Sequence, residues 1–308
     1  MTTILNNVRI GAAHRGLAVA LCAAGALSAC GSSVASAGGG GGRVQVAAAE
    51  NFWGSIAAQI GGDHAQVVSV ITSPDTDPHA YEPTPQDGRT FAEAQYIIID
   101  GAGYDPWAPK LVDANPSNDR HVLTVADLAG RKQGDNPHMW YSPAIVAQVI
   151  ARVTDDLKKL DSADAAYFDQ QAAIYTSAAL RNYDDLRAAI KARYSGVAVG
   201  ATESLFVDLA RDLGLDLVTP PEYMKAISEG NDPTAADKST FDTQISSGQI
   251  KVLVFNKQNA TPDIQGLVDT AHAAGIPVVA ITETLDPASA TFQGWQARQL
   301  ADLEAALG

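Results

Sequence analysis

Four side chains of the metal-binding types follow predicted strands, two in each half of the chain. His79 and His138 lie in loops of the N-terminal half, and each directly follows a proline. Glu203 and Glu283 directly follow predicted strands of the C-terminal half. Imidazole nitrogens and carboxylate oxygens are ligands that Zn²⁺ and Mn²⁺ accept. Two neutral imidazoles and two carboxylates also balance the charge of a divalent ion, which lowers the desolvation cost of a closed site. The pattern predicts one four-ligand site.

Each residue also has an interpretation without a metal. A histidine after a proline is more often a loop or cap residue than a ligand, and Glu203 begins a predicted helix, where the helix dipole favours a carboxylate. Glu283 could be a solvated acid, with Asp286 as its substitute at the site. Glu50, which ends the first predicted strand, is a further candidate. The matching positions at four strand ends favour the joint site. The other histidines of the mature domain are interpreted as structural or solvated: His64, His121 and His272.

The first thirty residues are typical of an export signal. Arg9 and Arg15 precede a short apolar run at 16–27, which is too short to remain as a membrane-spanning helix. The run ends in small residues before Cys30, as in a bacterial lipobox. We therefore expect a signal peptide at 1–29, a lipid on Cys30, and a Gly-rich flexible tether at 30–43. The alternative is an ordinary secretory signal that contains a cysteine.

Composition excludes some classes of function. Cys22 and Cys30 are the only cysteines, so the mature domain has no thiol for a disulfide or a metal. The formal charge of −14 argues against a nucleic-acid partner, because phosphate contacts need clustered Lys and Arg. We expect a monomer on the extracytoplasmic face of the cell membrane, held there by the lipid anchor.

From Arg43 onward, predicted strands and helices alternate, which is typical of α/β lobes with parallel sheets. We expect an N-terminal lobe at 44–161 and a C-terminal lobe at 194–308. The segment 162–193 has no proline or glycine and a helical apolar period. It predicts either one rigid helix connecting the lobes, which we favour, or two consecutive helices. Since ligands of parallel sheets lie beyond the carboxyl ends of the strands, the predicted site is the cleft between the lobes.

Four motifs in these segments resemble those of the zinc- and manganese-binding lipoproteins of bacterial ABC importers. They lie at 77–85, 136–140, 202–206 and 281–284, and the resemblance extends over residues 44–308. It implies that His79, His138, Glu203 and Glu283 hold one Mn²⁺ or Zn²⁺ as cargo. It further implies delivery of the ion to an ABC permease with a cytoplasmic ATPase, and a long connecting helix that limits hinge motion.

The chain departs from the family pattern at three places. A His-rich acidic loop, common in zinc-specific members, is absent from residues 80–137, and Glu203 stands where many members have a histidine. Both features favour manganese mildly, since Mn²⁺ accepts more oxygen ligands; Fe²⁺ stays open. The segment 255–259 differs from the acidic segment of the better-known manganese binders, which weakens the assignment of the fourth ligand.

Three other functions fit the sequence less well. A surface adhesin of the same family would show a large apolar patch, and the sequence has no obvious one. A metallohydrolase would need an open coordination position and a general base, and no hydrolase motif is present. A carrier of a metal chelate would need a broad cleft with arginine or aromatic walls. We therefore expect a metal carrier and no enzymatic activity.

Overall fold

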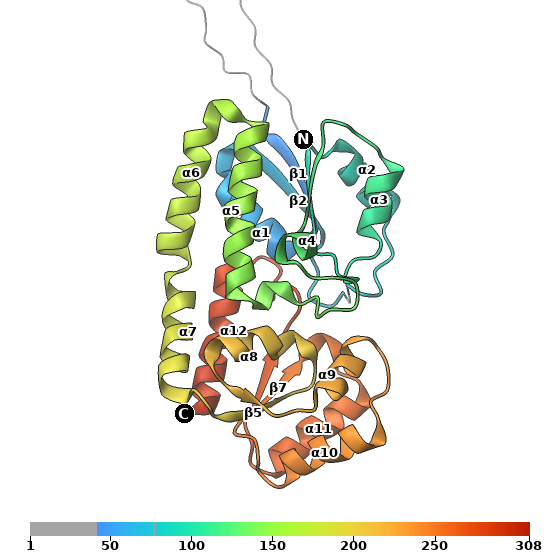
Figure 1. The fold of residues 1–308 in the computed structure, drawn as a ribbon, viewed down its shortest axis with the longest axis vertical. Helices are drawn as coiled ribbons and strands as arrows, with labels where there is room; N and C mark the ends of the chain where they lie inside the picture. Colours follow the sequence, from blue (N-terminus) through green and yellow to red (C-terminus); the bar gives the residue numbers. More distant parts are fainter. Residues whose placement is uncertain (1–41, 77) are drawn as a thin grey trace, which may run out of the picture. The chain divides into compact units, whose positions relative to one another are not determined.

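In the computed structural model, which describes residues 42–76 and 78–308, the strands form two four-stranded sheets (Figure 1). All paired strands are parallel, with orders β2-β1-β3-β4 and β6-β5-β7-β8. The two sheets confirm the predicted pair of α/β lobes. The strands are β1 (Val44–Glu50), β2 (Ala65–Ile71), β3 (Tyr96–Ile99), β4 (His121–Thr124), β5 (Ala198–Ala201), β6 (Asp216–Leu217), β7 (Leu253–Asn256) and β8 (Val278–Ile281).

The middle strands of the first sheet are buried on both faces. All four residues of β3 are buried, as are six of the seven residues of β1. Such continuous apolar runs are typical of parallel strands that helices cover on both sides. Because the strands are parallel, they all end at one edge of the sheet. At this edge, the loop after β2 brings His79 toward the second sheet. His138 lies in the loop after the short helix Val125–Ala129, which directly follows β4, and also faces the second sheet.

In the second sheet, β7 lies between β5 and β8. Glu203 follows β5 and Glu283 follows β8, so the two glutamates come from strands that are not neighbours. Asn256, the last residue of β7, lies between them. The strand order therefore places an amide side chain between the two carboxylates.

The helices follow the predicted alternation, with four additions, because the sequence did not predict α2, α3, α4 or α9. A capping box starts α2, in which Thr84 and Asp87 satisfy each other's backbone N–H groups. Prolines lie in the first turns of α2, α3 and α9. The helices are α1 (Asn51–Gly61), α2 (Pro85–Glu93), α3 (Ala108–Ala114), α4 (Val125–Ala129), α5 (Pro143–Leu160), α6 (Ala165–Ile174), α7 (Arg181–Tyr194), α8 (Val207–Leu213), α9 (Pro221–Ser228), α10 (Ala235–Ser246), α11 (Pro262–Ala273) and α12 (Phe292–Leu307).

The connecting segment is helical from Ala165 to Tyr194, but a π turn at Tyr175–Ala179 divides it into α6 and α7. The hydroxyls of Thr176 and Ser177 bond to carbonyls of the preceding turn, which competes with the regular helix ladder. Its first part packs on α1 and α5, and its second part packs on α8 and α12 (Figure 1). The segment is thus continuously helical between the lobes, as in the first predicted alternative, but it is divided into two α-helices, as in the second.

The last helix, α12, packs on α7 and β8 and also contacts α1 of the first lobe. The side chains of Gln59 and Gln293 exchange hydrogen bonds of 3.1 and 2.6 Å at this contact. No helix in residues 42–76 and 78–308 is long and apolar enough to cross a bilayer. The leader, Cys30, the first part of the tether and Asp77 lie outside the described residues, and the predicted domain boundaries stay predictions.

Candidate metal centre

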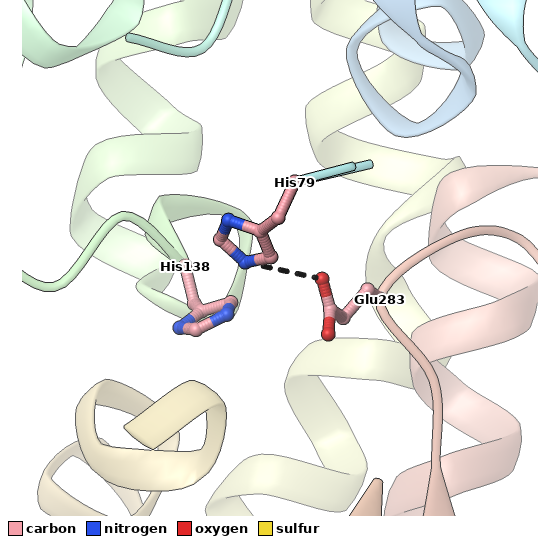
Figure 2. A group of neighbouring side chains, drawn as sticks. All are labelled: His79, His138 and Glu283. Carbon is pink, nitrogen blue, oxygen red and sulfur yellow. Dashed lines mark ion pairs between the residues drawn. The ribbon is translucent and has the colours of Figure 1, made fainter. Parts of the chain in front are cut away.

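Three of the four predicted side chains converge between the two sheets. His79, His138 and Glu283 each offer one ligand atom, and these three atoms lie within 4.8 Å of one another (Figure 2). Nε2 of His79 is 3.8 Å from Oε2 of Glu283, and the two imidazole rings are 6.1 Å apart between centroids. His138 and Glu283 are buried, whereas the His79 side chain is 29 % exposed. Two nitrogens and a carboxylate at this spacing could share a divalent cation.

His138 is oriented by Asn136 within its own loop. The side-chain oxygen of Asn136 accepts from the backbone N–H of His138, at 3.1 Å, and lies 2.8 Å from Nδ1 of the ring. The Asn136 amide nitrogen donates to the carbonyl of Ser204, at 2.8 Å, which shows that the oxygen faces the imidazole. Nδ1 therefore carries the proton and the lone pair is on Nε2.

Nε2 of His138 is buried and has no hydrogen-bond partner among the residues described. Burial, and then the nearby His79, hold the pKa of His138 well below its usual value. The imidazole is therefore neutral at physiological pH, as a metal ligand must be. A buried lone pair without a donor is costly, and a cation at Nε2 would remove that cost.

Tyr104 positions Glu283 from the first lobe. Its hydroxyl donates to Oε2 of Glu283 at 2.9 Å, and its ring packs edge-on against His79 at 4.7 Å between centroids. Burial, followed by the charge of Glu283, raises the pKa of Tyr104 well above its usual value, so the phenol keeps its proton. One tyrosine thus contacts a proposed ligand from each lobe.

Glu203 lies beside this group and is joined to it through Asn256. The Asn256 amide nitrogen donates to Oε2 of Glu203 at 3.1 Å and to Oε1 of Glu283 at 2.6 Å. Glu203 is 1 % exposed, and it lines a cavity of about 330 Å³ together with His79 and Glu283. Glu203 therefore shares a cavity with two of the three grouped residues, although it is outside the group that lies within 4.8 Å.

Gln258 links the loops that bear His79 and Glu283. Its side-chain oxygen accepts from the backbone N–H of Glu283, at 2.6 Å, and of Thr284, at 3.2 Å. Its amide nitrogen donates to the carbonyl of Thr76, at 3.1 Å. A second link joins Tyr141 of the first lobe to the carbonyl of Thr282, at 2.7 Å. These bonds set the spacing between the lobes at the site.

The weaker candidates lie elsewhere. Asp286 forms an ion pair with Lys257 at 3.2 Å and is not among the grouped ligands. His64 lies with Asp161 and Asp164 in a partly exposed group at the start of α6, where the helix dipole opposes a cation. His272 is exposed on α11. The interpretation of His64 and His272 as structural or solvated stays a prediction.

Glu50 belongs to a group of buried carboxyls near Tyr104 rather than to the site. Glu50, Asp100 and Asp105 are each at most 1 % exposed. Burial, and then the charges of Asp105 and Asp100, raise the pKa of Glu50 well above its usual value. Burial also raises the pKa of Asp105 to about 6. Glu50 and Asp105 contact each other, and their contact is a hydrogen bond only when one carboxyl is protonated.

Sequence reasoning missed Tyr104, Asn256 and Gln258. Asn256 and Gln258 lie in the segment 255–259, which stood out only as a departure from the acidic pattern of the family. Their positions at and after the end of β7, at the same sheet edge as Glu203 and Glu283, are the signal that could have found them. Tyr104 had no such signal, because it lies in an irregular loop after β3.

Comparisons with known proteins identify relatives that are named as metal-binding lipoproteins. Over 254 residues the chain is 24 % identical to the zinc-binding lipoprotein AdcA of Streptococcus pneumoniae, covering 74 % of this chain and 47 % of AdcA. It is 25 % identical to the manganese-binding lipoprotein MntA of Halalkalibacterium halodurans, covering 52 % of each. The chain thus spans about half the length of these relatives.

The fold resembles that of solved metal-binding proteins. The periplasmic zinc-binding protein TroA from Treponema pallidum matches with a TM-score of 0.71 and 17 % identity, covering 87 % of this chain and all of TroA. A family model described as zinc-uptake complex component A, periplasmic, matches residues 46–306. The match extends over both lobes and the segment that connects them, and so the chain belongs to this zinc-uptake component A family.

Proposed function

We propose that this protein is the extracytoplasmic solute-binding lipoprotein of an ABC importer, and that it captures one Zn²⁺ or Mn²⁺ ion. The observation that supports this most is the meeting of His79, His138 and Glu283 within 4.8 Å, from three loops on two lobes. Relatives named as zinc- and manganese-binding lipoproteins support the same cargo class. We propose Glu203 as the fourth ligand, from its place on the same cavity.

The chemistry of the four side chains suits a carrier. With two neutral imidazoles and two carboxylates, a divalent ion would leave the site without net charge, so a buried site costs little electrostatically. Four protein ligands can fill the coordination shell of Zn²⁺, whereas a hydrolytic zinc centre keeps one position open for water. We therefore propose transport rather than catalysis. The adhesin alternative has no observation in its favour.

The partners and location follow from the family and the leader. We propose that a lipid on Cys30 holds the protein at the outer side of the cell membrane, and that a membrane permease with a cytoplasmic ATPase receives the ion. The bonds of Gln258 and Tyr141 between the lobes would keep the site largely formed before the ion arrives. Such preorganisation lowers the cost of binding.

Metal titration of ligand variants tests the proposal. We expect His79→Ala and His138→Ala each to weaken Zn²⁺ binding by more than about 100-fold, since loss of residues that only support ligands costs about 10- to 100-fold. Competition with a chelating dye on untagged protein measures the dissociation constants. His272→Ala is the matched control, because it removes an exposed histidine of α11. Wild-type affinity in both site variants would refute the proposed site.

A further inference from the structure

The side chain of Asn256 forms a hydrogen bond with one oxygen of each of the two glutamates. Asn256 is fully buried at the end of β7, and its Nδ2 group donates to both Oε2 of Glu203 and Oε1 of Glu283. Its Oδ1 atom accepts from the backbone N–H of Gln258 at 3.0 Å. Because that acceptor role is taken by the oxygen, the amide nitrogen must face the carboxylates. Both of its hydrogens are therefore used on proposed ligands.

These bonds limit how Glu283 can bind an ion. Oε2 is the oxygen near His79, at 3.8 Å from Nε2, and it also accepts from Tyr104. Oε1 is held by Asn256 at 2.6 Å. A cation beside His79 would meet Oε2, which keeps a lone pair beside its hydrogen bond from Tyr104. The hydrogen bond from Asn256 draws charge from Oε1 and fixes the orientation of the carboxylate, so Oε1 is the weaker donor for a second bond to the ion. The same argument applies to Oε2 of Glu203, which Asn256 also holds.

We propose that Asn256 is a specificity-determining residue that makes both glutamates bind the ion through a single oxygen, and so favours Zn²⁺ over Mn²⁺. This inference rests on the proposed function. Two nitrogens and two single oxygens make four donors, the usual number for Zn²⁺ at a closed site. Mn²⁺ is best served by six oxygen-rich donors, which two-oxygen carboxylates would help to supply. The hydrogen bonds of Asn256 therefore favour Zn²⁺, whereas Glu203 and the absence of a His-rich loop favoured Mn²⁺ at the level of the sequence.

The test removes the amide while keeping its size. Asn256→Leu has no donor, so both carboxylates can rotate and use two oxygens. Co²⁺ reports the coordination number, because four-coordinate Co²⁺ absorbs visible light much more strongly than the five- or six-coordinate ion. We expect strong four-coordinate bands from the wild type and weaker bands from Asn256→Leu. Zn²⁺ affinity should fall about 10- to 100-fold. The preference for Zn²⁺ over Mn²⁺, as a ratio of dissociation constants, should fall at least tenfold.

The change in that ratio is decisive, since Zn²⁺ outcompetes Mn²⁺ at most protein sites in any case. Asn182→Leu, on the exposed face of α7, is the matched control. Five- or six-coordinate Co²⁺ in the wild type would overturn the inference and leave the proposed function intact. A folded Asn256→Leu protein with unchanged Co²⁺ bands and an unchanged ratio of Zn²⁺ and Mn²⁺ dissociation constants would have the same consequence. If Asn256→Leu does not fold, the Co²⁺ spectrum of the wild type and the same measurements on Asn256→Ser decide whether the inference holds. Failure of the wild type to bind Zn²⁺, Mn²⁺ or Co²⁺ would instead remove the proposed function and this inference with it.

Discussion

The buried carboxyl Glu50 should make the metal-free protein lose stability as the pH rises. Glu50 is fully buried, and its pKa in the folded state lies well above the ordinary value of 4.5 because of burial and the charges of Asp105 and Asp100. Between these two pKa values the folded protein binds a proton that the unfolded chain has lost. The free energy of unfolding therefore falls with rising pH, and the contribution is complete only below about pH 4.5.

The size of the effect follows from proton linkage. Each pH unit in which Glu50 is protonated only in the folded state lowers the free energy of unfolding by about 1.4 kcal/mol. Glu50→Gln removes this dependence, because glutamine is neutral in both states and its amide N–H can donate to Asp105 as the protonated acid does. Between pH 5 and pH 7, we expect the free energy of unfolding of the variant to rise relative to that of the wild type by up to roughly 3 kcal/mol.

Urea unfolding from pH 4 to pH 8, with a chelator present, measures this difference. The chelator is needed because a bound ion would stabilise the folded state by mass action. Glu222→Gln, at an exposed position in α9, is the matched control and should follow the wild type at every pH. A difference between Glu50→Gln and wild type that stays constant with pH would show that Glu50 does not hold its proton in the folded state.

Two further predictions concern the orientation of a ligand and the anchor. Asn136→Ala should weaken Zn²⁺ binding about 10- to 100-fold in the same dye competition, because His138 loses the acceptor that places its lone pair on Nε2. The control Asn182→Ala should bind Zn²⁺ as the wild type does, and unchanged affinity in Asn136→Ala would refute the role of Asn136. Cys30→Ala should abolish lipid labelling in cells and release the protein from the membrane fraction, and label retained by this variant would contradict the lipobox assignment.

The sequence predicted the two lobes, and it singled out the four proposed ligands, because both steps depend on local patterns. Alternating buried strands and amphipathic helices predict parallel sheets, and each proposed ligand follows one of these strands. The bounds of strands predicted from apolar runs differ from the observed bounds by a residue or two. The run at 251–255 predicts a strand that ends at Phe255, whereas β7 extends from Leu253 to Asn256. The π turn at Tyr175–Ala179 was not visible, since an apolar period of three and four residues is kept across it.

The residues that support the ligands could not be predicted in this way, because they depend on the order of strands in space. Glu203 and Glu283 follow β5 and β8, and the chain passes through β6 and β7 between them. A sheet in which β5 and β8 were neighbours would place the two carboxylates side by side, with like charges in contact. The observed order instead inserts β7, whose last side chain is a neutral donor to both glutamates. The spacing and the available oxygens of the two acids are thus consequences of sheet order, which periodicity alone does not determine.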